Sequence, residues 1–208
     1  MAAFFGNLRN VVIASFALAG VMVAIYICTQ GFDGLLFELF LLRWLHVAAG
    51  VMWIGLLWYF NFVQIPTMPK VPDELKKGVT GYIAPAALFW FRWAAMVTMV
   101  LGVILALRNG YLLEAYTLDL SDGLEGWPAV PKYLAIGIAM WLGTIMWFNV
   151  WFVIWPNQQK ALNIGNKYPD LAPADKAAAG KTAMIFSRVN TLLSAPMLFG
   201  MVAAGHLY

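Results

Sequence analysis

The sequence predicts an all-α integral membrane protein with five transmembrane helices. Hydrophobic residues make up 62% of its 208 residues and charged residues only 11%, against ~45–50% and ~25% in soluble domains. Five apolar segments are each long enough for the ~20-residue helix that crosses the hydrocarbon layer of a bilayer. No alternating pattern typical of a membrane β-barrel accompanies them. The first predicted partner is therefore the lipid bilayer.

The five spans follow one another within a single predicted domain, residues 1–208. They cover about residues 11–28, 35–63, 83–107, 133–155 and 185–207. The first span is not expected to be a cleaved signal peptide, because its apolar run is too long and only Arg9 forms a basic start. The second span is longer than a bilayer requires, so part of it is expected to protrude or tilt. We recognise no internal repeat.

Loop charges predict the orientation of the spans. Three lysines lie between spans two and three, and four lie between spans four and five. They share one side with Arg9, whereas Arg108 and Lys132 lie on the other side with most of the acidic residues. The positive-inside rule predicts a cytoplasmic N-terminus and an external C-terminus in a bacterial inner (cytoplasmic) membrane, with several passes. The basic residues are scattered rather than clustered with aromatics, so no nucleic acid partner is expected.

Two histidines are the main candidates for function, because ionisable residues inside a span are costly. His46 in span two and His206 in span five are both predicted in the outer leaflet. Each lies beside a Val-Ala-Ala-Gly sequence ending at Gly50 or Gly205, and small residues let a flat group approach a helix. The pattern predicts a b-type haem between two imidazoles, with Arg43 meeting a propionate. The alternative is ordinary helix packing, with each histidine serving only as a hydrogen-bonding group.

Two arginines and a tryptophan stripe complete the polar and aromatic features of the spans. Arg92 is expected to pair with a carbonyl or a lipid phosphate, or to face a cavity and contact a cofactor. Arg188 is expected to snorkel to the headgroups. Span four carries Trp147, Trp151 and Trp155 at intervals of four residues. They are predicted to form a lipid-facing or packing stripe with an interfacial anchor at Trp155; a stacking wall for a ring-shaped ligand is the alternative.

One stretch resembles a known family. Residues 41–55, LLRWLHVAAGVMWIG, followed by Tyr59-Phe60 and later by WFRW at residues 90–93, resemble the membrane domain of bacterial membrane-bound urate oxidases (urate hydroxylases). More distantly, the first block is similar to copper-resistance membrane proteins and haem-binding protoporphyrinogen oxidases. The resemblance covers residues 41–107 best and implies a redox-linked, haem-binding membrane domain, with His46 at the shared motif. Those oxidases have further spans and a cytochrome c domain, whereas this chain contains no Cys-x-x-Cys-His.

Three functions follow as hypotheses. The first is a redox-linked membrane protein whose b-type haem, with His46 and His206 as metal ligands, transfers electrons between a quinone or small substrate and an external acceptor. The second is a non-catalytic accessory or structural subunit of a homo-oligomer or larger membrane complex. The third is a copper-handling protein, because thioethers suit Cu(I) and methionines recur one turn apart at Met96, Met99, Met197 and Met201.

Overall fold

The computed structural model describes residues 2–120, 123–124 and 126–208 and contains helices and turns, but no strand, in that part of the chain. Five of its helices are long and apolar enough to cross a membrane, which confirms the predicted fold class. The chain divides into two compact units, Met1–Phe40 and Leu41–Tyr208. Asp122 and Glu125, two of the acidic residues predicted on the same side as Arg108 and Lys132, lie outside the described residues.

In the unit Met1–Phe40, the described residues 2–40 form helices joined by two short connections. It contains α1 (Ala2–Phe5), α2 (Leu8–Gln30) and the start of α3 (Gly34–Trp58). The Asn7 side chain caps α2 by accepting a hydrogen bond from the Arg9 backbone nitrogen at 3.0 Å. No residue of α2 is buried, and its exposed surface is almost entirely apolar. That surface suits a helix surrounded by lipid, as predicted for span one.

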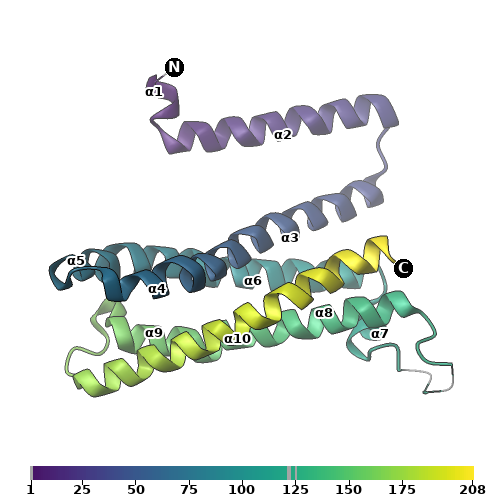
Figure 1. Cartoon of the computed structure of the whole chain (residues 1–208). Helices are drawn as coiled ribbons and strands as arrows, with labels where there is room; N and C mark the ends of the chain where they lie inside the picture. The colour runs from purple at the N-terminus through teal and green to yellow at the C-terminus, as the bar shows by residue number, and fades with distance from the viewer. Residues whose placement is uncertain (1, 121–122, 125) are drawn as a thin grey trace. The chain divides into compact units, whose positions relative to one another are not determined.

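The unit Leu41–Tyr208 is a bundle of four long rods (Figure 1): three are made of consecutive helical pieces, and the fourth is the single helix α10 (Pro173–His206). Three of the pieces, η1, η3 and η4, are π-helical, and η2 and η5 are short 3₁₀ turns. After α3 the pieces are η1 (Tyr59–Gln64), α4 (Ile65–Thr67), η2 (Met68–Lys70), α5 (Asp73–Gly78), η3 (Val79–Ile83), α6 (Ala84–Arg108), α7 (Leu112–Tyr116), α8 (Pro131–Phe148), η4 (Asn149–Ile154), α9 (Trp155–Leu162), η5 (Ile164–Asn166) and α10 (Pro173–His206).

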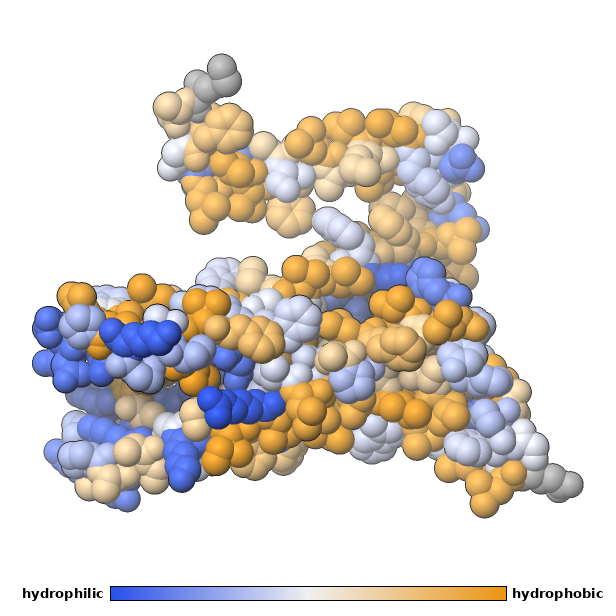
Figure 2. Space-filling view, in the orientation of Figure 1, coloured by the Kyte–Doolittle hydropathy of each residue, from blue (hydrophilic) through white to orange (hydrophobic). Residues whose placement is uncertain are grey.

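The two ends of this bundle differ in charge. In Figure 1, α4, α5 and α9 lie at one end, whereas α7 and the C-terminus lie at the other. The lysine-rich connections therefore share one end, which we call the basic end, and hydrophilic residues gather there in Figure 2. This sharing is the arrangement that the loop charges predicted. That the basic end faces the cytoplasm stays a prediction.

The rods extend beyond the predicted spans, chiefly at the basic end. The helix of span five begins at Pro173 rather than near residue 185. The length of an apolar run reflects the thickness of the hydrocarbon layer, whereas the helix itself continues as long as the next residues favour helical backbone. Lysine and alanine are good helix formers, and residues 176–181 consist of them and one glycine. The helices are therefore longer than the apolar spans, and the bounds of the spans within the membrane stay predictions.

One hydrophobic core joins the four rods. At the end opposite the basic end, α7 packs on α8, where a Cβ added at Gly137 would collide with the carbonyl oxygen of Ala115. That close approach explains a glycine in the middle of a helix, despite the ~1 kcal/mol that glycine costs there relative to alanine. The main core is formed by the buried residues Trp53, Ile54, Leu57, Phe60, Leu88, Phe91, Ala94, Ala95, Met146, Val150, Ile154, Ala183 and Met197.

Polar side chains connect α10 to the two rods that contain η1 and η4. From the sequence we expect the polar stripe of span five, which consists of Ser187, Asn190, Thr191 and Ser194, to hydrogen-bond between helices, and three of these four residues do. Such bonds average ~0.6 kcal/mol each in membrane bundles, so they contribute register more than stability. The bonds run from Asn149 Nδ2 to Asn190 Oδ1 (2.9 Å), from Asn61 Nδ2 to Ser187 Oγ (2.8 Å) and from Trp58 Nε1 to Ser194 Oγ (3.0 Å).

Those two rods also contain a sequence repeat, so the expectation of no internal repeat was wrong. Residues 52–61, MWIGLLWYFN, and residues 140–149, MWLGTIMWFN, are identical at five of ten positions. Each ends in an asparagine that donates to α10, and each enters a π-helical segment at or near that asparagine. The repeat was missed because its ten residues lie among similar apolar residues, and the shared hydrogen bonds and π turns make it visible.

Candidate functional site

The imidazole of His46 is held by the neighbouring helix α6. Its Nδ1 atom lies 2.9 Å from the carbonyl oxygen of Thr98. Because a carbonyl oxygen only accepts, Nδ1 must carry the proton, and Nε2 of the neutral ring then carries the lone pair. His46 therefore presents the nitrogen that a metal or a hydrogen-bond donor would use.

The ring of His46 also lies directly against Gly102. A Cβ added at Gly102 would come within 2.8 Å of the imidazole Cε1 and 3.1 Å of Nδ1. Thr98 itself is buried, and its hydroxyl donates to the Ala94 carbonyl oxygen at 2.8 Å. Thr98 and Gly102 were missed in the sequence. They lie one turn apart on span three, and nothing in the sequence says which residues of that span meet His46.

His206 lies in the last turn of α10 and is exposed. Its Nδ1 atom is 3.0 Å from the Val202 carbonyl oxygen, one turn back on the same helix. By the same argument its Nε2 carries the lone pair. Among the described residues, no hydrogen bond links His206 to another helix, and no contact joins it to His46. The shared pocket for the two imidazoles stays a prediction.

The two small-residue sequences do not have the same surroundings. A Cβ added at Gly50 would lie 3.8 Å from the Thr98 methyl group, so this glycine faces α6. A Cβ at Gly205 would have no atom within 4 Å. The contact at Gly50 therefore supports ordinary helix packing at this glycine, whereas the surroundings of Gly205 are open.

Arg43 acts on a tyrosine at the end of the bundle opposite the basic end. Tyr111 stacks on Tyr133 with ring centroids 6.0 Å apart. Burial raises the pKa of Tyr111, the positive charge of Arg43 opposes that rise, and Tyr133 adds to it. The exposed Arg43, one turn from His46 along α3, is therefore a positive charge that bears on the pKa of Tyr111.

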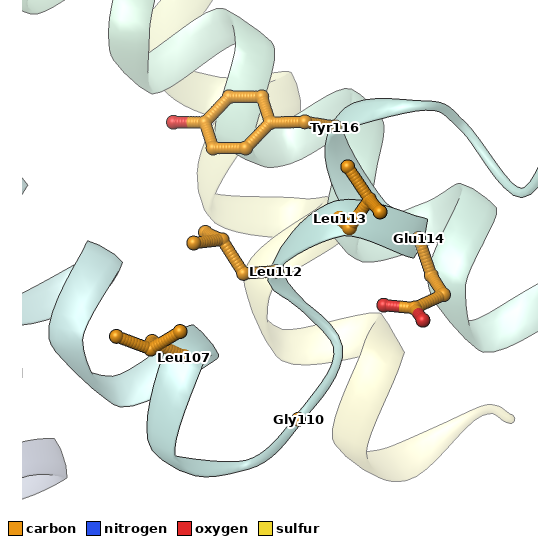
Figure 3. Close-up of a pocket in the computed structure, with 6 residues that line it drawn as sticks. All are labelled: Leu107, Gly110, Leu112, Leu113, Glu114 and Tyr116. Atoms are coloured by element: carbon orange, nitrogen blue, oxygen red, sulfur yellow. The ribbon is translucent and has the colours of Figure 1, made fainter.

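Neither of two cavities on the described part of the bundle is lined by a histidine. The larger, about 400 Å³, is an open depression formed by Leu107, the turn at Gly110 and residues of α7, with Glu114 and Tyr116 at its edge (Figure 3). The smaller, about 190 Å³, lies near the basic end. Its lining holds the uncharged polar side chains of Gln64, Thr80, Gln158 and Ser187.

Arg92 lies among tryptophans and makes no contact with His46. Its guanidinium carbon is 3.6 Å from the centroid of the Trp155 ring. Arg92 also precedes Thr98 on α6, so it lies closer to the basic end than the His46 contact does. The described residues contain no group of three or more His, Cys, Asp or Glu side chains that could hold a metal ion.

Comparisons of this chain with models of protein families, with curated proteins and with solved structures found no match. The resemblance to the membrane domain of urate oxidases therefore stays a prediction from residues 41–107. The class that the fold defines is a multi-pass helical membrane protein.

Proposed function

We propose that this protein is a redox-linked membrane protein in which Nε2 of His46 ligates the iron of a b-type haem. The observation that carries the proposal is the 2.9 Å hydrogen bond from Nδ1 to the Thr98 carbonyl oxygen. Histidines that ligate metals usually donate their other nitrogen to a carbonyl or carboxylate, which fixes the tautomer and the ring orientation. Gly102 adds a second constraint on the same ring.

The residues near His46 fit this group in their chemistry. The neutral imidazole that donates from Nδ1 to this carbonyl keeps a lone pair on Nε2, and the neighbours Val47 and Val51 are apolar and exposed, as a hydrophobic macrocycle requires. Haem supplies one-electron transfer between ferric and ferrous iron. His46 would hold the iron, Arg43 would neutralise a propionate, and His206 is the proposed second ligand. Gly50, Gly205 and Arg92, also predicted at the haem, have no part in this proposal.

The proposal includes a location and partners. The basic end would face the cytoplasm of a bacterial inner membrane, so His46 would lie toward the outer leaflet. Electrons would pass between a quinone or a small substrate and an external acceptor. The similarity of residues 41–107 to the membrane domain of urate oxidases supports a redox role, but urate oxidation is not part of the proposal.

An absorption spectrum of the purified protein between 350 and 600 nm tests the haem. We expect a Soret band that His46→Ala abolishes and that Thr98→Val retains, because valine keeps the backbone carbonyl that accepts from His46. His206→Ala should retain the haem but convert its spectrum from low-spin to high-spin if His206 is the second ligand. A wild-type protein from haem-sufficient cells without a Soret band, or an unchanged band in His46→Ala, would refute the proposal.

The alternative functions predict other results from the same preparation. An accessory subunit would purify in a stable larger complex without an absorbing group of its own. A copper-handling protein would contain copper in a metal analysis. Met197, one of its predicted ligands, is buried in the main core, where methionine commonly fills space.

A further inference from the structure

Three tryptophans surround the guanidinium group of Arg92. Its Cζ atom lies 3.6 Å from the centroid of the Trp155 ring, 5.4 Å from that of Trp151 and 5.9 Å from that of Trp93. The rings of Trp93 and Trp151 also meet edge to face, with centroids 5.4 Å apart. These residues come from α6, η4 and α9, so the arrangement exists only in the folded bundle. We call Arg92, Trp151 and Trp155 the arginine cage.

The arginine cage lies where the apolar part of the rod α8–η4–α9 ends. Trp155 opens α9, whose next residues are Pro156, Asn157, Gln158, Gln159 and Lys160. Tryptophan favours the boundary between hydrocarbon and headgroups. Side chains on a helix point toward its N-terminus, and the N-terminus of α6 is at the basic end. The guanidinium of Arg92 therefore reaches headgroup depth although its backbone lies within the span.

The arginine cage contains hydrogen-bond donors and a positive charge, but no acceptor. Nε and Nη1 of Arg92 and Nε1 of Trp151 are buried and have no hydrogen-bond partner in the described part of the chain. The three spans predicted at residues 83–107, 133–155 and 185–207 contain no Asp or Glu. A charge removed from water without a partner is costly, and an indole can only donate. The group that would complete this site is an anion.

The surroundings of the arginine cage indicate where the anion comes from. Trp93 is 44% exposed and Phe152, next to Trp151, is 58% exposed. Exposed aromatic rings within a membrane-spanning segment face lipid. Arg92 is half-buried; Nε and Nη1 are enclosed, so a phosphate would approach from the side of Nη2, and the planar fork of an arginine suits two oxygens of a phosphate. We propose that the arginine cage binds the phosphate group of an anionic membrane lipid.

Arg188 is the matched control for this site. It is also an arginine within a predicted span, but it lies on α10, is exposed and has no aromatic ring stacked on it among the described residues. An exposed arginine can exchange water and lipid freely, so its removal should change general affinity for anionic lipid only slightly. The comparison separates a built site from a charge that simply lies near the headgroups.

Native mass spectrometry of the purified full chain with added phosphatidylglycerol tests the proposal. We expect wild type to retain one phosphatidylglycerol about 10 to 100 times more tightly than Arg92→Gln, the range for lost hydrogen bonds to a charged group. Arg188→Gln should match wild type. Arg92→Lys should fall between, since it keeps the charge but loses the planar fork. Equal affinities for wild type and Arg92→Gln, or equal losses in both glutamine variants, would overturn the proposal.

Two further ligands identify the source of the anion. Diacylglycerol with the same chains should not compete, and equal competition would mean an apolar groove rather than a phosphate site. Inorganic phosphate alone should not displace the lipid; displacement that depends on Arg92 would assign the site to a soluble anion and overturn the lipid proposal. If Arg92→Gln loses helix content by circular dichroism, Arg92→Lys and Trp155→Leu replace it, both with weaker lipid binding expected. Haem content is not measured, so the result is independent of the proposed function.

Discussion

His46 and His206 have the same local sequence beside them but different tertiary surroundings. Each lies next to Val-Ala-Ala-Gly, and each donates Nδ1–H to a backbone carbonyl oxygen, at 2.9 Å and 3.0 Å. The acceptor of His46 is Thr98 on another helix, whereas that of His206 is Val202, four residues back on its own helix. The same tautomer therefore results from a tertiary contact in one case and from local geometry in the other.

This difference in surroundings determines which imidazole already has a fixed orientation before a ligand binds. The His46 ring is fixed by Thr98 on one nitrogen and by Gly102 against its edge. The exposed His206 keeps rotamer freedom that it would lose on binding, which lowers affinity. A pre-organised ligand does not incur that entropy cost. If a haem is bound, we therefore expect His46 to contribute more to its affinity than His206.

The largest expected effect comes from filling the space beside His46. Gly102→Ala places a Cβ within 2.8 Å of the ring and should lower the free energy of unfolding by about 1–3 kcal/mol, as overpacking does. Gly205→Ala adds its Cβ to open space and should raise that free energy by up to ~1 kcal/mol through helix propensity. Unfolding in mixed micelles measures both. Equal effects of the two alanines would refute the contrast between the two sites.

A smaller effect is expected from removing the imidazoles themselves. His46→Ala loses the interhelical hydrogen bond to Thr98 and should destabilise the haem-free protein by about 1 kcal/mol. His206→Ala removes an exposed side chain bonded to its own helix, so its effect should stay within about 0.5 kcal/mol. The same mixed-micelle unfolding, on protein prepared without haem, compares them. A loss in His206→Ala that equals the loss in His46→Ala would contradict the comparison.

The smallest expected effect concerns Tyr111, near Arg43. Burial raises the pKa of Tyr111 in the folded state above its unfolded value, so the folded state keeps the phenol proton to higher pH. Its contribution to stability is therefore complete below about pH 10 and is lost as the pH rises through the folded pKa.

Absorbance at 295 nm follows this titration, and Tyr111→Phe identifies the signal by removing it. Because the charge of Arg43 lowers the pKa of Tyr111, Arg43→Gln should move the midpoint further upward. A midpoint that stays unchanged would show that Arg43 does not act on this tyrosine, and would leave the propionate as its one proposed partner.

The sequence predicted some features of the candidate site and not others. His46 was predicted from the cost of an ionisable group in a span, and the polar residues of span five were predicted to bond between helices, which Ser187, Asn190 and Ser194 confirm. Thr98 and Gly102 could not be predicted, because their role depends on the register between two rods. The repeat was present in the sequence, and neither of its two copies contains a histidine.

The arginine cage is a second set of contacts between rods that the sequence could not predict. The stripe at Trp147, Trp151 and Trp155 was predicted to be a packing or lipid-facing surface with an anchor at Trp155. For Arg92 the sequence allowed several partners: a carbonyl, a lipid phosphate, or a cofactor in a cavity. Their meeting depends on α6 lying against the rod that holds η4 and α9, and on the direction of a long side chain. Neither property follows from the spacing of residues along one helix.

The sequence by itself determined that the chain forms five apolar helices, because only a helix satisfies its own backbone hydrogen bonds in lipid. It also determined that the lysine-rich connections share one end, since consecutive spans alternate in direction. The tertiary structure decided which side chains meet: His46 with Thr98 and Gly102, and Arg92 with Trp151 and Trp155. Those contacts depend on the rotation and register of packed helices, which are set by side-chain volumes from several rods acting together.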